Sequence, residues 1–193
     1  MHAGARPRWL AGLMLLAPLL AGAADEPSEY LDEETAATVT IVGAPLVFAC
    51  ERRDLAAHAR DYVTLAATAV SRNRQLDYYL VAYFWSTVAP HLRADALPSP
   101  PVLSLQADDR RIDLRRSVLS ARAAGISTGV HPPPGEAPRP LLYPTDLATL
   151  RFLAAARRLK VLSDAEATPA GFALWSDERA ALRTFVLRMS GGR

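Results

Sequence analysis

Apolar and polar residues alternate in several separate runs of the chain, and the period becomes helical in the last fifty residues. The clearest alternating runs are 62–70 and 78–88 on either side of the polar stretch 71–75, which predicts an antiparallel hairpin. The second run is apolar on both faces, so we expect a central strand that is covered on each side. Two shorter β-rich runs, 38–42 and 46–50, precede the hairpin.

Three further segments complete the first 140 residues. The stretch 54–59 fits either one helical turn or a loop. Residues 102–107 and 111–115 predict a second hairpin about 108–110, with one wet face and a place near the sheet edge. The Pro-rich stretch 131–140 predicts an exposed connection. The apolar face of the second hairpin consists of Leu103, Leu105, Ile112 and Leu114, and its polar face of Ser104, Gln106, Asp113 and Arg115.

The last fifty residues predict the order strand, helix, strand, strand, helix. Asp146 ends a helix-start motif, and the apolar spacing that follows predicts a helix with Arg157, Arg158 and Lys160 near its end. Short strands are expected at 161–162 and 172–175, and Ser176 is expected to cap a second helix. The fold class is therefore α+β, a mainly antiparallel sheet or sandwich with two helices in the C-terminal fifty residues. The second helix has an apolar stripe of Leu182, Phe185, Val186 and Met189.

The first 23 residues predict a signal peptide, with a basic start, an apolar run over 9–20 and Ala21-Gly22-Ala23 at its end. A retained membrane anchor needs about 20 apolar residues, and this run stops short of Asp25. Ala23 stands where a bacterial lipoprotein has its acylated Cys, so lipidation is not expected. We therefore expect a periplasmic or secreted protein without an integral membrane segment, in which an acidic arm at 24–36 precedes a single α+β domain at 37–193.

Charge and composition exclude several classes of function. Without the two arginines of the leader the chain has 20 basic and 20 acidic residues, which gives no support for nucleic-acid binding. The four His are scattered and there is one Cys, so neither a metal site nor a cofactor is predicted. Cys50 is interpreted as a packed apolar residue. The acidic run 32–34 lacks the spacing of a calcium loop.

No catalytic residue is assigned from the sequence. Ser127, His131 and Asp146 form a catalytic trio only on paper, since Ser127 lacks the strand-turn-helix context of a nucleophile. An aromatic row of Tyr79, Tyr83 and Trp85 would line one face of the second long strand. An open face would suit a glycan or a protein partner, whereas apolar residues on both faces favour a core position under the helices.

A resemblance to known proteins is carried by Tyr30-Leu31-Asp32-Glu33-x-Thr35 with Thr38-Val39-Thr40, by Pro45 to Ala49 and by Arg60 to Leu65. In these segments the chain resembles a group of uncharacterised exported proteins and lipoproteins of proteobacteria. The resemblance covers about residues 28–88 and implies no activity and no site. We therefore expect a soluble, exported envelope protein that acts as a non-catalytic binding or structural module, with another envelope protein or a cell-wall glycan as partner. The alternative is a small periplasmic hydrolase that acts on an envelope substrate.

Overall fold

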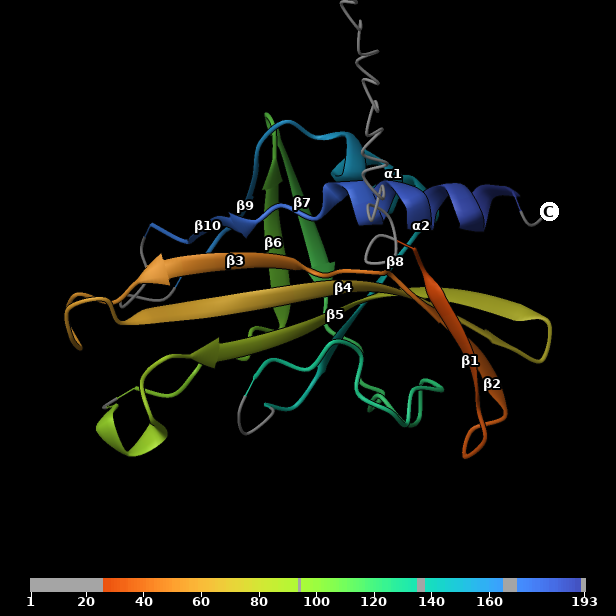
Figure 1. Cartoon of the computed structure of the whole chain (residues 1–193), viewed down its shortest axis with the longest axis horizontal. Coiled ribbons are helices and arrows are strands. Elements are labelled where there is room, and N and C mark those ends of the chain that lie inside the picture. Colours follow the sequence, from red (N-terminus) through yellow and green to blue (C-terminus); the bar gives the residue numbers. More distant parts are fainter. Residues whose placement is uncertain (1–25, 94, 135–137, 165–169, 192–193) are drawn as a thin grey trace, which may run out of the picture.

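Figure 1 shows a computed structural model of the chain, which describes residues 26–93, 95–134, 138–164 and 170–191. Within these ranges ten strands form one sheet and two α-helices lie in the last fifty residues, as the α+β prediction requires. The predicted signal peptide lies outside the described residues. The strands are β1 (Ser28–Asp32), β2 (Ala37–Ile41), β3 (Leu46–Glu51), β4 (Arg60–Arg72), β5 (Gln75–Ser86), β6 (Val102–Ala107), β7 (Arg110–Arg115), β8 (Leu141–Thr145), β9 (Leu159–Val161) and β10 (Phe172–Ser176), and the helices are η1 (Pro90–Leu92), α1 (Leu147–Ala155) and α2 (Arg179–Gly191).

The sheet is antiparallel and branches at β4. One edge of β4 pairs with β3 in its first half and with β2 in its second half, while the other edge pairs with β5 along its whole length. The path continues from β3 through β10, β9 and β6 to β7, and β8 pairs with β5. The amide of Ser117, just after β7, donates to the carbonyl of Leu142 in β8 over 2.7 Å. The sheet therefore curls until its two ends approach each other.

The long hairpin of β4 and β5 is the centre of the molecule. Its turn is tighter than the polar stretch 71–75 suggests, because only Asn73 and Arg74 lie between the strands. Both have positive φ, 52° and 65°, which fits the two-residue turn whose twist matches that of the strands. Residues 79–84 of β5 are all buried, so both faces of this strand are covered, as its two apolar faces predict. Residues 61–70 of β4 are buried as well.

The two faces of this hairpin are covered by different parts of the chain. Helices α1 and α2 lie on one side, and the segment between β7 and β8 lies on the other (Figure 1). On the helix side Leu182, Phe185 and Val186 are at most 4% exposed and Met189 is partly buried, which confirms the predicted stripe. Phe185 belongs to the same core cluster as Phe48, Leu80 and Phe84.

On the other side the segment 117–134 is held by hydrogen bonds to the sheet. Asp32 is 3% exposed and accepts from the Ser127 amide and hydroxyl, both at 2.7 Å. Burial by itself would raise the pKa of Asp32, but these bonds and those from Thr35 outweigh it and lower the pKa to about 2. Farther along, Nε2 of His131 lies 2.6 Å from the carbonyl of Val42.

Several other element boundaries differ from the sequence prediction. Residues 28–32 of the predicted acidic arm form β1, because they pair in register with 37–41 and Glu29 accepts from Thr40 at 3.1 Å. Helix α1 ends at Ala155, since the Asp108 carboxylate accepts from the amides of Arg157 and Arg158 and turns the chain into β9. Helix α2 begins at Arg179, and Ser176 is the last residue of β10. The open choice at 54–59 is settled as a loop of turns.

A buried ionic cluster joins the loop after β3 to the segment after β5. The side chains of Arg52, Asp61 and Arg93 are 2%, 1% and 3% exposed. Nη1 of Arg52 donates to Asp61 over 2.7 Å, and Arg93 donates to both oxygens of Asp61. At the solvent side, Asp95 accepts a hydrogen bond from Nη1 of Arg52 and Asp54 accepts one from Nη2. Two distant loops are thus fixed at one end of the long hairpin.

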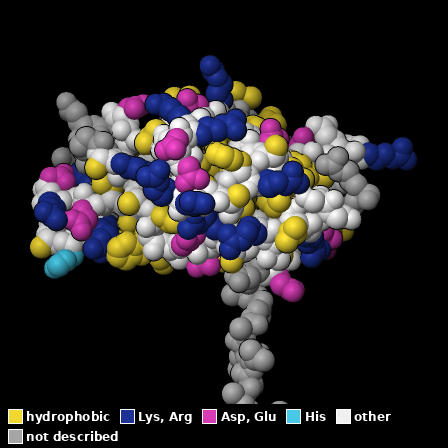
Figure 2. All heavy atoms as spheres, turned by 90° about the horizontal axis from the view of Figure 1, so that it is seen from above, with side chains coloured by type: hydrophobic (Ala, Val, Ile, Leu, Met, Phe, Trp, Pro, Cys, Tyr) yellow, Lys and Arg dark blue, Asp and Glu magenta, His cyan; other side chains and the backbone are white. Residues whose placement is uncertain are grey.

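The surface seen in Figure 2 carries acidic and basic side chains in mixed order, without a continuous basic area on that face. No helix among the described residues is long and apolar enough to cross a membrane.

Candidate functional site

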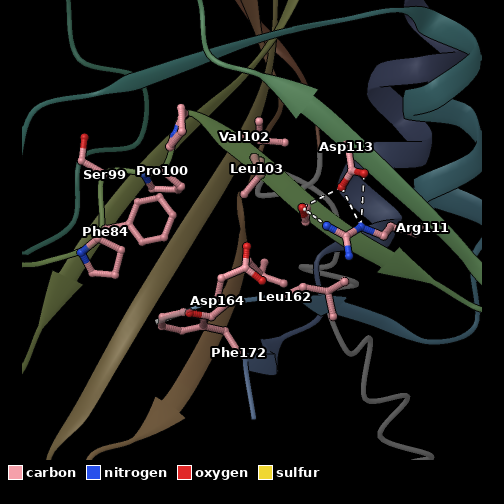
Figure 3. Close-up of a pocket in the computed structure, with 15 residues that line it drawn as sticks. Phe84, Ser99, Pro100, Val102, Leu103, Arg111, Asp113, Leu162, Asp164 and Phe172 are labelled. Carbon is pink, nitrogen blue, oxygen red and sulfur yellow. Dashed lines mark hydrogen bonds and ion pairs between the residues drawn. The ribbon is translucent and has the colours of Figure 1, made fainter. Parts of the chain in front are cut away.

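A cavity of about 590 Å³ opens between the start of β6, the preceding Pro-rich segment and the residues after β9. Its volume lies in the range of small-molecule sites. The interior wall is apolar, with Phe84 and Phe172 in edge-to-face contact at a centroid distance of 6.3 Å (Figure 3). The apolar lining consists of Phe84, Pro98, Pro100, Val102, Leu103 and Phe172 together with Pro101, Val161 and Leu162.

A polar cluster on the β6–β7 hairpin lies at one end of the cavity. Register places Ser104 of β6 directly opposite Asp113 of β7, and Arg111 precedes Asp113 by two positions on the same face. The Ser104 hydroxyl donates to Asp113 over 2.6 Å, and Nε of Arg111 donates to both Asp113 oxygens over 2.9 and 3.2 Å. Nη2 of Arg111 donates to the Ser104 oxygen over 3.0 Å (Figure 3). The three side chains are thus hydrogen bonded to one another.

The electrostatics of this cluster suit binding better than proton transfer. The hydrogen bond from Ser104, followed by that from Arg111, lowers the pKa of Asp113, and the bond to Asp113 raises the pKa of Arg111. A carboxylate with a lowered pKa is a weak base near neutral pH. It therefore does not activate the Ser104 hydroxyl to which it is bonded.

The wall formed by residues 98–101 is fixed before any ligand arrives. Proline restricts φ, and the carbonyls of this segment are held by groups from other elements. The Tyr143 hydroxyl donates to the Pro100 carbonyl over 2.7 Å, and the Arg116 amide donates to the Pro101 carbonyl over 2.8 Å. On the opposite wall, the Leu162 amide donates to the Ser104 carbonyl over 2.8 Å. A preformed cavity lowers the entropic cost of binding.

The predicted aromatic row lies elsewhere, on the opposite face of β5. Tyr79 and Tyr83 are 7% and 2% exposed, and the Val130 amide is hydrogen bonded to the Tyr83 hydroxyl. Burial raises the pKa of both tyrosines. Trp85 is half-buried, stacks on Tyr62 at 4.2 Å and donates to Thr64 over 3.0 Å. Tyr79 and Tyr83 are thus core residues, and the covering segment is the one between β7 and β8 rather than the helices.

The structure separates the trio of Ser127, His131 and Asp146. Ser127 donates to Asp32, His131 contacts the Val42 carbonyl, and Asp146 caps α1 by accepting from the Thr149 amide over 2.6 Å. Each side chain has a structural partner of its own, so the three do not form a catalytic unit.

Cys50 and the acidic residues show no metal chemistry in the described part of the chain. Burial, ahead of the neighbouring charges, raises the pKa of the Cys50 thiol, which favours the packing interpretation. Among residues 26–93, 95–134, 138–164 and 170–191, no three His, Cys, Asp or Glu side chains gather as metal ligands would.

The search of protein-family models, curated proteins and solved structures finds no match to this chain.

Sequence reasoning did not find the cavity. The one signal available was the polar face of the 102–115 hairpin, which contains Ser104 and Asp113 and which the pattern assigns to solvent. The walls come from residues 98–101 and 161–164, and nothing local indicates that these segments meet β6.

Proposed function

We propose that the protein is an exported, non-catalytic binding module of the bacterial envelope whose ligand occupies the cavity beside β6. The observation that carries the proposal is the combination of a preformed apolar wall with a polar cluster at one end. Such a site binds an amphipathic ligand, with its apolar body against the apolar lining and its polar head toward the charged side chains of the cavity. Export rests on the leader sequence at 1–23.

Binding is tested with N-phenyl-1-naphthylamine, a neutral dye that fluoresces strongly in apolar surroundings. We expect saturable enhancement with the wild-type protein. Val102→Trp places a large side chain in the cavity wall and should abolish the enhancement. The matched control is Leu187→Trp on α2, since Leu187 is 72% exposed and does not line the cavity. Equal enhancement in the two variants would contradict the cavity as the binding site.

The hydrolase alternative is separated by an activity assay. If the site were catalytic, a p-nitrophenyl ester would turn over and Ser104→Ala would abolish the turnover. We expect no turnover above that of Ser104→Ala. Export is checked by the intact mass of the protein from a periplasmic extract, which should lack residues 1–23.

A further inference from the structure

The charges around the cavity are unequal in number. Arg111 contributes one positive charge, while Asp113 and Asp164 contribute two negative charges. Asp113 is engaged by Arg111 and Ser104, so those groups form a closed set. Asp164 remains as the carboxylate that is not part of this set. The lining as a whole is therefore negative by one charge.

Asp164 lies on the wall opposite the polar cluster and follows β9. Its carboxylate points into the cavity between Phe172 and Leu103 (Figure 3). No described residue donates a hydrogen bond to it, although it is near enough to Arg111 to contribute to the raised pKa of that guanidinium. The carboxylate is thus available to a ligand.

The rest of the lining offers little to an anion. Pro98, Pro100 and Pro101 have no amide hydrogen to donate. The Leu162 amide is already bonded to Ser104. The Arg111 guanidinium is bonded to Asp113 and also interacts electrostatically with Asp164. An anionic head would therefore meet more repulsion than attraction.

We infer that the cavity takes a ligand with a positively charged ammonium head on an aromatic or aliphatic body, and that Asp164 is the counter-ion of that head. The body lies against the part of the apolar lining that is accessible from the cavity, which includes Pro98, Pro100 and Val102. This inference rests on the proposed function, since it specifies the ligand class of the same cavity.

Three probes of the same shape and different charge test the inference: phenethylamine, 2-phenylethanol and 3-phenylpropionate. Each is titrated into the full mature chain at pH 7 and low salt by displacement of N-phenyl-1-naphthylamine. Phenethylamine should bind about fivefold tighter than 2-phenylethanol, as an ion pair at a solvent-accessible site allows. Phenylpropionate should bind more weakly than the alcohol. The advantage of the amine should decrease as salt is added.

Two variants with the same change in net charge locate the effect. Asp164→Asn should remove the preference for the amine and leave the affinity for 2-phenylethanol unchanged. Asp109→Asn in the β6–β7 turn should preserve the preference, because that side chain is 97% exposed and pairs with Arg158 outside the cavity. Since Asp164 is also exposed, both variants should unfold at the wild-type urea concentration.

Each other result has a defined meaning. Equal affinities for amine and alcohol, or a preference that survives Asp164→Asn, overturn the ammonium inference and leave the cavity as a binding site. Tightest binding of phenylpropionate also overturns it and assigns the head to Arg111. If neither the dye nor any probe binds, the proposed function and the inference both fail.

Discussion

Replacing Asp61 with Asn tests whether the buried ionic cluster holds the two loops at the end of the long hairpin. Asp61 is the acceptor that Arg52 and Arg93 share, and all three side chains are at most 3% exposed. Asn keeps the size of the side chain and removes its charge. Two guanidinium groups would then remain buried with only the partly exposed Asp95 and the exposed Asp54 as counter-ions.

The expected loss follows from the cost of leaving a buried charge unpaired. Removing one member of a buried pair costs about 3 to 5 kcal/mol, and the remaining contacts to Asp95 and Asp54 favour the lower end, about 3 kcal/mol. For a domain of this size such a loss lowers the melting temperature by about 10 °C. It is also a large part of the whole stability of a typical domain, about 5 to 15 kcal/mol.

Urea unfolding at pH 7 measures this loss, with Asp109→Asn as the matched control. Asp109 and its partner Arg158 are 97% and 78% exposed, so their separation should cost at most about 1 kcal/mol. If the two variants unfold at the same urea concentration, the cluster does not stabilise the fold and the reasoning is refuted.

The pH dependence supplies a second measurement of the same cluster. Burial acts to raise the pKa of Asp61, but hydrogen bonds from Arg93, Ser86 and Arg52 outweigh it and leave the pKa below its usual value. A carboxyl whose pKa is lowered by folding stabilises the folded state above its unfolded pKa of about 3.9. That contribution is lost as the pH falls through the folded pKa. The free energy of unfolding of the wild-type protein should therefore exceed that of Asp61→Asn at pH 7, and this difference should disappear below about pH 4.

Two further predictions use the same unfolding assay. Phe185 is 0% exposed, so Phe185→Ala should lower the free energy of unfolding by about 3 to 5 kcal/mol. Leu187 is 72% exposed, so Leu187→Ala should lower it by under about 0.5 kcal/mol. Equal losses would mean that α2 does not pack through its predicted stripe. Asp32→Ala leaves the Ser127 and Thr35 amides without their acceptor and should lower the free energy of unfolding by about 1 to 3 kcal/mol. Amide hydrogen exchange in 120–130 should become faster, and unchanged exchange there would argue against Asp32 as the anchor.

Arg183 would be a poor control for the Phe185 variant. Its side chain lies on the outer part of α2, yet Nη1 donates to the Ala154 carbonyl near the end of α1 over 3.2 Å. Periodicity assigns a residue to the side of a helix that faces away from the core. It does not reveal a long side chain that reaches back to a neighbouring helix.

The sequence by itself determined the elements whose signals are local. Alternation identified the β4–β5 and β6–β7 hairpins, and helical spacing identified the buried stripe of α2, because burial of one face fixes the period of apolar residues. The helix start at Asp146 is also a local signal, because its carboxylate accepts a hydrogen bond from an amide three residues away. The aromatic row on β5 was placed on one face correctly, and its apolar neighbours favoured the core position that Tyr79 and Tyr83 occupy.

Only the tertiary structure decided features that depend on segments far apart in the chain. Asp108 ends α1 from about 50 positions away, and Asp32 anchors Ser127 from 95 positions away. The cavity requires residues 98–101 and 161–164 to meet the polar face of the β6–β7 hairpin. The pattern of a strand states which residues share a face, but whether solvent, a helix or another loop covers that face depends on how the whole chain packs.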